Sequence, residues 1–247
     1  MYKVVWVAAF HDGISGEDAR RHWRTVHGPL GAKVPGVERY VQNHVVSALG
    51  PVATSDERAY FDGYSCCWYR DRETFEQSLT TPQWGALGVD SPNLFDDSRW
   101  DGWSAALDAR TIIDGDEAPF KTVWFCRFKP DVRTDPERTR EAHEYWIRMH
   151  GGHYGVEVPG IERYVQNHVI RAIDASGETD AIAMDFEGFS ECWFRDEAAF
   201  EQAMASDEWL RMNEDAHEVF DVDYIVPHMS AVLEQHVMAG GDREPQG

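Results

Sequence analysis

Basic residues are scarce in this chain. Lysine and arginine together number 23 against 44 aspartates and glutamates, so the formal net charge is −21 at pH 7 over 247 residues. Nucleic acids and anionic membrane surfaces attract proteins through basic patches, and we therefore expect neither as a partner. No apolar run approaches the ~20 residues of a membrane-spanning helix. The amino terminus, MYKVVWVAAF, is typical of a strand and lacks the layout of a cleaved signal. We expect a cytoplasmic protein.

Cysteine is equally scarce. The four cysteines are Cys66, Cys67, Cys126 and Cys192, and no two of them form a CxxC pair. A disulfide framework or a zinc site needs closer or more regular spacing. The sequence therefore predicts reduced thiols in a reducing compartment.

Recurrent ligand sets for metals and nucleotides are also missing. The segments His150-Gly-Gly-His153 and Glu141-x-His143 resemble ligand pairs, but the matching stretch near Gly28 holds no second histidine. No glycine-rich phosphate loop of a standard pattern occurs. We expect neither a metal nor another cofactor.

The chain does contain a long internal repeat. VPGVERYVQNHV at 34–45 returns as VPGIERYVQNHV at 158–169, and FDGYSCCWYRD at 61–71 returns as FEGFSECWFRD at 186–196. A segment of linker composition lies between the copies. These observations predict two similar domains, at 1–114 and 119–240.

Each copy shows the same order of predicted elements. In the first copy these are a strand at 3–10, a helix from near Ser15 that HGP at 27–29 stops, strands at 37–47 and 60–69, a helix from Asp71, a short helix at 82–88 and a strand at 102–112. The order is βαββαβ, the ferredoxin-like pattern. Such a unit leaves one sheet face bare, and two units in one chain bury these faces against each other. We expect an α+β fold in which two fused ferredoxin-like repeats form an intramolecular dimeric α+β barrel, a monomeric pseudo-dimer or a homodimer of it, with a cavity between the sheets.

Alternation along the repeated strand sorts its side chains. Tyr40, Gln42 and His44 share one face, and Val41 and Val45 share the other. Valines suit a helix-packed face, so we expect the polar set to face the cavity. The same reasoning assigns Tyr164, Gln166 and His168 in the second copy, and makes Gln42, His44, Gln166 and His168 candidate substrate contacts.

Two histidines stand where the first helix of each copy is expected to end. His27 and His150 each precede a glycine, and Trp23 and Trp146 lie four residues earlier as further candidate substrate contacts. A helix carboxyl end favours a charged imidazole and raises its pKa, which suits a general acid or base. The alternative is a histidine that only caps its helix.

The motifs HGP, VPGVERYVQNH and GYSCCWY together resemble the EthD family of dimeric α+β barrel proteins, in a wider group with 4-methylmuconolactone methylisomerase. The resemblance covers nearly the whole chain, once per half. It implies a pocket lined by a histidine, a tyrosine and a cysteine. The matching residues are His27, Tyr40, Cys67, His150, Tyr164 and Cys192.

The resemblance and the residue types together suggest a function. We expect a cofactor-independent isomerase or lyase that moves a proton on a small lactone, carbonyl or aromatic-derived substrate. The histidine would take the proton, the tyrosine would hydrogen-bond the enolate oxygen, and the buried cysteine would remain a neutral thiol. A polyketide-type cyclase or dehydratase, and a small-molecule binding protein without turnover, are the alternatives.

Overall fold

The computed structural model describes residues 1–49, 61–96, 98, 102, 104–174, 176–180, 182–225 and 230–241. Residues 60 and 103, each near the start of an expected strand, lie outside this set. No helix in the described part of the chain is long and apolar enough to cross a membrane.

The two halves share the order of their long strands and main helices. The first half contains β1 (Tyr2–Ala8), α1 (Gly16–His22), the π-helix η1 (Trp23–His27), α2 (Gly28–Gly31), β2 (Val37–Ala48), β3 (Gly63–Tyr69), α3 (Arg72–Ser78), α4 (Pro82–Asp90), the 3-10 helix η3 (Ser91–Asn93) and β4 (Ser104–Ile113). The second contains β5 (Phe120–Cys126), α5 (Pro130–Arg133), α6 (Pro136–Tyr145), the π-helix η4 (Trp146–Tyr154), the 3-10 helix η5 (Gly155–Glu157), β6 (Ile161–Asp174), β7 (Gly177–Thr179), β8 (Gly188–Phe194), α7 (Glu197–Met204), α8 (Asp207–Ala216), α9 (Val222–Ile225) and β9 (Ser230–Ala239).

Local capping explains where the helices begin. The Ser15 side chain accepts a hydrogen bond from the backbone N–H of Asp18 at the start of α1, and Asp71 does the same for Thr74 at the start of α3. Both predicted starts are confirmed. The predicted stop at HGP is wrong, because the chain passes through a π-helical turn and Pro29 falls in the first turn of α2. A proline is tolerated there because the first turn does not need its N–H.

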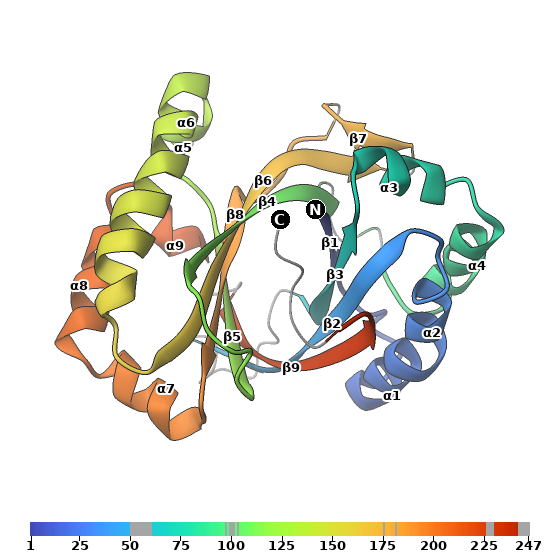
Figure 1. Cartoon of the computed structure of the whole chain (residues 1–247), viewed down its shortest axis with the longest axis horizontal. Coiled ribbons are helices and arrows are strands. Elements are labelled where there is room, and N and C mark those ends of the chain that lie inside the picture. The colour runs from blue at the N-terminus through green and yellow to red at the C-terminus, as the bar shows by residue number, and fades with distance from the viewer. Residues whose placement is uncertain are drawn as a thin grey trace.

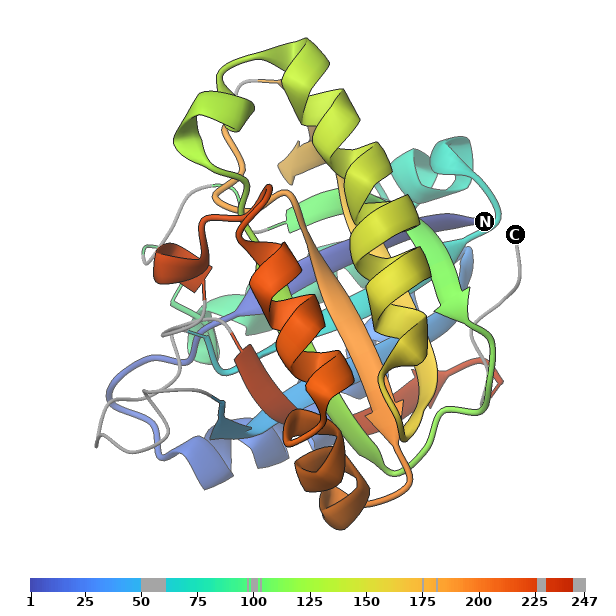
Figure 2. The same cartoon turned by 90° about the vertical axis from the view of Figure 1, so that its left-hand side faces the viewer.

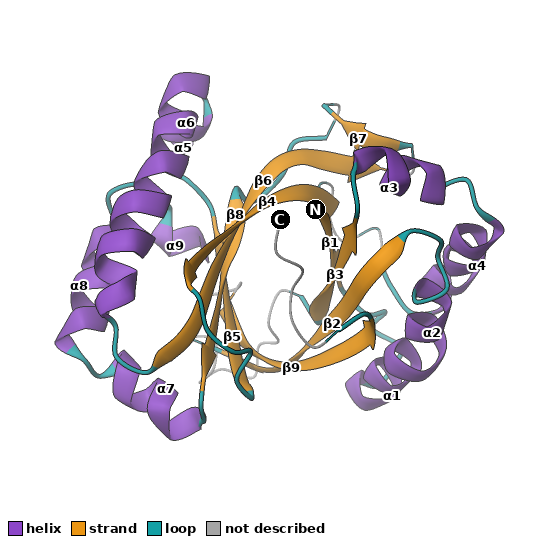
Figure 3. Cartoon of the chain, viewed as in Figure 1, coloured by secondary structure: helices purple, strands orange, loops and turns teal. Residues whose placement is uncertain are grey.

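One closed antiparallel barrel joins the two halves (Figures 1 and 3). Strand β4 pairs on one edge with β1 of its own half and on the other edge with β6 of the other half. Strand β9 does the same with β5 and β2. The sheets are therefore hydrogen-bonded into one ring and do not merely face each other. The helices of the two halves lie outside this ring on opposite sides, with α6 and α8 running roughly alongside the orange strand β8 (Figures 1 and 2).

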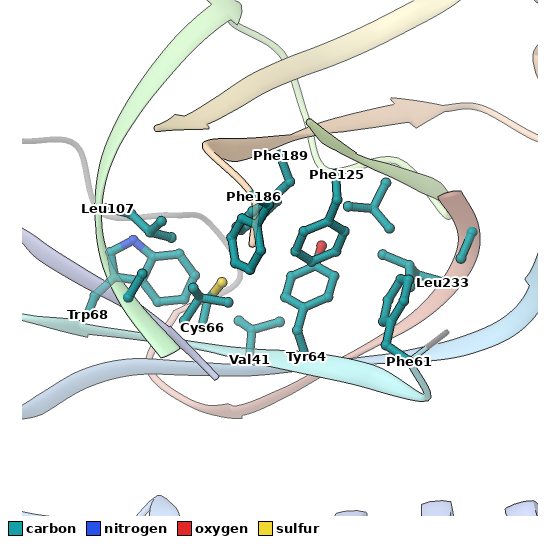
Figure 4. Close-up of a cluster of buried hydrophobic side chains, with 14 residues drawn as sticks. Val41, Phe61, Tyr64, Cys66, Trp68, Leu107, Phe125, Phe186, Phe189 and Leu233 are labelled. Carbon is teal, nitrogen blue, oxygen red and sulfur yellow. The ribbon is translucent and has the colours of Figure 1, made fainter. Parts of the chain in front are cut away.

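Side chains fill the barrel where a ligand cavity was expected. Aromatic rings from both halves meet at its centre, with Tyr64 and Phe189 at 5.2 Å and Phe125 and Phe186 at 5.0 Å between ring centroids. Figure 4 shows these rings pointing toward one another from opposite walls. The prediction of a cavity between the sheets is thus wrong, because large aromatic residues close the space.

A charged cluster is buried in the same interior. Both lysines that begin the repeated strands reach one carboxylate, with Lys121 Nζ 2.5 Å and Lys3 Nζ 3.6 Å from Glu191 oxygens. Glu191 also accepts a hydrogen bond from the Tyr64 hydroxyl, at 2.7 Å. Cys66 occupies the position equivalent to Glu191, so a single carboxylate serves two cations from the two halves. Burial opposes ionisation of Glu191, but the lysines outweigh it and hold the pKa of this carboxyl well below its usual range.

Candidate functional site

The π-helical turns of the two halves carry the repeated histidines. His27 is the last residue of η1, and His150 lies within η4. The predicted position at a helix end is therefore wrong, since helical backbone continues beyond both residues. Single π-turns inside helices are rare and occur often at functional sites. Each histidine faces a helix late in its own half, α4 in the first half and α8 in the second.

Each histidine meets an aspartate from that helix. His27 Nδ1 lies 2.9 Å from Oδ2 of Asp90 at the end of α4, and His150 Nδ1 lies 2.9 Å from Oδ2 of Asp215 in α8. Both histidine rings also stand edge-on to a phenylalanine, Phe95 in the first half at 5.1 Å. The structure thus repeats one His–Asp dyad at two places on opposite sides of the barrel.

The aspartates fix the tautomer of these imidazoles. An ionised carboxylate only accepts hydrogen bonds, so His27 and His150 must carry hydrogen on Nδ1, and the neutral form of each ring then has its lone pair on Nε2. Neither Nε2 atom makes a hydrogen bond within the described residues, and neither is fully enclosed. The side chains of His27 and His150 remain 11% and 10% exposed, so each ring keeps some contact with solvent.

The second partner of the aspartate differs between the halves. Asp90 also lies 3.0 Å from His22 Nε2, whereas Asp215 accepts a hydrogen bond from the Tyr145 hydroxyl. Burial opposes ionisation of Asp90, but these contacts hold its pKa below the usual range. The same balance lowers the pKa of Asp215.

Burial changes the expected titration of His27. Loss of solvent lowers its pKa below the ordinary 6.5, and the hydrogen bond to Asp90 offsets this only in part. The prediction that a helix end raises this pKa is therefore wrong. At neutral pH, His27 is a neutral imidazole that can accept a proton.

Tyr40, Gln42 and His44 form a polar row on the repeated strand. This row faces the helices and not the barrel interior. Gln42 Nε2 donates to the Trp23 carbonyl at 3.0 Å and to the Tyr40 hydroxyl at 2.9 Å, and Gln42 Oε1 lies 3.1 Å from His44 Nε2. Val41 packs inside the barrel. The predicted assignment of faces is therefore reversed. The π-turn offers a carbonyl that accepts from the Gln42 amide, whereas Val41 packs among the apolar side chains of the barrel.

The second half repeats this row. Gln166 Nε2 donates to the Trp146 carbonyl at 3.0 Å and to the Tyr164 hydroxyl at 2.9 Å, and its Oε1 lies 3.2 Å from His168 Nε2. His143, which has no histidine counterpart in the first half, adds a contact of 2.9 Å between its Nδ1 atom and that of His168.

These rows are enclosed, and their members contact one another. Trp23 stacks on His44 with ring centroids 4.4 Å apart, and Trp146 lies 4.3 Å from His168. The expected substrate contacts Gln42, His44, Gln166, His168, Trp23 and Trp146 are all buried. Burial lowers the pKa of His44 and of His168 to about 3, so both are neutral.

The tyrosines and cysteines of the expected pocket lie beside these rows. Tyr40 is 3% exposed and Tyr164 is fully buried. The described structure therefore gives neither hydroxyl the open path to a substrate that its expected role needs. Burial raises the pKa of the Cys67 and Cys192 thiols, which are neutral. A glycine next to each dyad histidine fits this packing, since a Cβ on Gly28 would lie 2.7 Å from Gln42 Nε2.

Sequence analysis missed the two aspartates. Asp90 and Asp215 stand 125 residues apart, the same offset as Trp84 and Trp209. The helical segments that end at these aspartates otherwise differ in sequence, PQWGALGVD in the first half and DEWLRMNED in the second. An acidic residue that returns at this offset within otherwise different helices was the available signal. Among the described residues, no three or more histidines, cysteines, aspartates or glutamates gather as metal ligands would.

Comparison with known proteins defines the family. The EthD domain model matches residues 11–98 and 135–223. No curated protein sequence matches the chain. The crystal structure of an anthrone oxidase-like protein is similar with a TM-score of 0.57 at 12% identity, over 98% of this chain and 94% of that one. A candidate monooxygenase from Fusobacterium nucleatum subsp. nucleatum ATCC 25586 gives 0.52 at 10% identity, over 99% and 98%.

These two structural likenesses show the fold, a barrel with outer helices. The family match rests on sequence and is independent of them. It covers well over half of the chain, once in each half, and it confirms the resemblance that the HGP and ERYVQNH motifs indicated. The protein therefore belongs to the EthD family.

Proposed function

We propose that this protein is an enzyme that moves a proton at a carbon next to a carbonyl group of a small organic molecule. One observation carries the proposal: the same His–Asp dyad, with an open Nε2 atom, stands in both halves. In this proposal His27 and His150 are the general bases. Each half, 1–114 and 119–240, is a ferredoxin-like unit with its own site.

The dyad has the chemistry that this step needs. The carboxylate of Asp90 or Asp215 holds the imidazole in the tautomer that leaves Nε2 unprotonated, and it stabilises the imidazolium that forms when Nε2 takes the proton. A free base near neutral pH is the effective form for removing a proton from carbon. The lowered pKa of His27 keeps it in that form.

The buried rows then position the dyads. Gln42 donates to the Trp23 carbonyl of the π-turn that ends at His27, and the Tyr40 hydroxyl holds the same amide. Gln166 and Tyr164 repeat this arrangement at the Trp146 carbonyl near His150. They act as positioning residues that do not touch the substrate. The thiols of Cys67 and Cys192 fill space on the same face of the sheet.

Isomerase, lyase and cyclase reactions share the first step, loss of the proton from carbon. An oxidase reaction shares it as well, since the carbanion can then pass its electrons to O2. The similar fold of the anthrone oxidase-like protein favours this as a second candidate. The two outcomes differ in whether oxygen is consumed.

Exchange of hydrogen for deuterium tests the shared step. The protein is incubated in D2O without oxygen with anthrone, a butenolide lactone and a β-keto acid, and deuterium at the acidic carbon is followed by NMR. We expect exchange above the buffer rate with at least one compound, and consumption of O2 in air only if the oxidase reaction holds. Exchange at the buffer rate with every compound would contradict the proposal.

A further inference from the structure

A hollow of about 520 Å³ opens in the second half, where α5 and α6 meet the loop before β8. Its wall includes Arg133, His143, Met184, Phe186 and Glu187. Neither histidine of the two dyads lines it, so it is separate from the proposed reaction centres. Its volume falls within the range of roughly 300–1,000 Å³ found for small-molecule sites.

A chain of hydrogen bonds fixes the tautomer of His143 at this wall. Gln166 Nε2 donates to a backbone carbonyl, so its Oε1 must face His168 Nε2 and accept from it. His168 therefore carries hydrogen on Nε2 and a lone pair on Nδ1. That lone pair faces His143 Nδ1 at 2.9 Å, so the hydrogen of this contact belongs to His143.

The result is an unprotonated nitrogen at the pocket. A neutral imidazole carries one hydrogen, and that of His143 is on Nδ1, so Nε2 holds a lone pair. This atom makes no hydrogen bond with any described residue and is not fully enclosed. Burial lowers the pKa of His143 to about 4, which keeps the ring neutral at pH 7.

Arg133 supplies a fixed cation to the same pocket. Its Nε atom donates to Glu187 Oε1 at 2.6 Å and its Nη2 atom donates to the Met184 carbonyl, which together hold the guanidinium plane. No described residue accepts from Nη1. Glu187 also accepts from the Phe128 N–H, at 2.7 Å.

The cations of the wall are matched by nearby carboxylates. Arg133 pairs with Glu187 in the wall, and Arg127 contacts Asp185 outside it, at 3.1 Å. In a chain with a net charge of −21, a carboxylate ligand would therefore be held by the Arg133 Nη1 donor and not by a net positive field.

We propose that this pocket binds a small carboxylate that also carries a hydroxyl group. Arg133 Nη1 donates to the carboxylate, His143 Nε2 accepts from the hydroxyl, and Met184 and Phe186 cover the apolar body between them. The site belongs to the second half, because Arg20 stands three residues before Trp23 where His143 stands three before Trp146. Within the described residues the dyad therefore occurs in both halves, whereas the histidine of this pocket is present in the second half alone.

Calorimetric titration of the full chain at pH 7 tests this proposal. The probes are 3-hydroxybenzoate, 4-hydroxybenzoate and 4-hydroxyphenylacetate, with benzoate as the matched compound without a hydroxyl. We expect at least one hydroxy acid to bind more tightly than benzoate. We expect H143F and R133Q each to weaken it about tenfold or more, the loss of one good hydrogen bond. The exposed-residue controls H153F and R140Q should leave it unchanged.

Two further measurements make the test independent of the dyads and of folding. Binding should survive in the H27A/H150A variant, so a failure of the proposed reaction would leave it intact. Nitrogen-15 NMR of the unsubstituted protein should show His143 Nε2 as unprotonated and shifting as the hydroxy acid is added. The proposal is wrong if no probe binds tighter than about 10 mM, if H143F and R133Q bind like the controls, or if His143 carries its hydrogen on Nε2.

Discussion

Asp90 and Asp215 hold equivalent places in the two halves, and each lies 2.9 Å from the Nδ1 atom of a histidine on a π-turn. The contact joins elements from opposite ends of each half, since about 60 residues separate the partners. The helices that carry the aspartates, α4 and α8, differ in sequence, yet both halves keep the histidine and the aspartate of the contact. A role at the Nε2 side of the histidine accounts for this better than packing does, because packing needs no carboxylate.

Removing the charge of these aspartates should impair the reaction while preserving the fold. We expect D90N and D215N together to lower kcat by roughly 100-fold or more, because an amide can donate to Nδ1 and favour the wrong tautomer. KM should change little. Steady-state kinetics on the compound that exchanges deuterium checks this.

The His22 contact provides a matched control for the aspartate variants. In an H150A background, where only the first site works, H22Q removes an imidazole from Asp90 but leaves the bond from His27 in place, so kcat should fall by less than about threefold, the weak effect of a partly exposed pair. Equal losses in D90N and H22Q in that background would mean that Asp90 acts only in packing.

The pH dependence of the first site follows from the lowered pKa of His27. Protonation removes the lone pair, so activity is lost as pH falls through a value below the ordinary 6.5. In an H150A background, kcat/KM should be constant between pH 7 and 8 and decline only on the acid side of about 6.5. A decline that begins above pH 7 would contradict burial as the cause.

The outline of this fold follows from the sequence, but its inner and outer faces do not. Repetition of ERYVQNHV indicates two copies, and Ser15 and Asp71 mark helix starts by local hydrogen bonds. The face of Tyr40 depends on which surface offers a partner for Gln42, and that partner is the Trp23 carbonyl of a π-turn. Alternation cannot reveal a partner that another element supplies.

The candidate site, like the fold, could be predicted only in part from the sequence. His27 and His150 stood out because each sits beside a glycine in a repeated motif. Asp90 comes from a helix 63 residues away in the chain, and only folding brings it to His27. The expected cavity failed for a related reason, since nothing local indicates that Tyr64 and Phe189 meet inside the barrel.

Neutralising Glu191 should destabilise the barrel strongly. E191Q keeps the shape but leaves Lys3 and Lys121 without a buried counter-charge, which costs about 3–5 kcal/mol. Urea unfolding followed by tryptophan fluorescence measures it. The exposed E197Q is the control, and adding K121M to E191Q should recover part of the loss. A change below about 1 kcal/mol in E191Q would show that the cluster is not held by this charge.

Acid should destabilise the fold through His44 and His168. Their folded pKa of about 3 lies below the ordinary 6.5, so the unfolded chain binds more protons between these values. Stability therefore falls as pH is lowered through 6.5, by up to about 1.4 kcal/mol per pH unit for each histidine. Urea unfolding at pH 6.5 and 5.5 should show this slope, and H44Q/H168Q should flatten it. An unchanged slope would place the titration elsewhere.

The most direct test of the dyads is deuterium exchange at the acidic carbon of the substrate by four proteins: the unsubstituted chain, H27A, H150A and H27A/H150A. We expect each single variant to keep the activity of the other half, and the double variant to fall to the buffer rate while it still binds the substrate. Full exchange by the double variant would contradict the assignment of His27 and His150 as the bases.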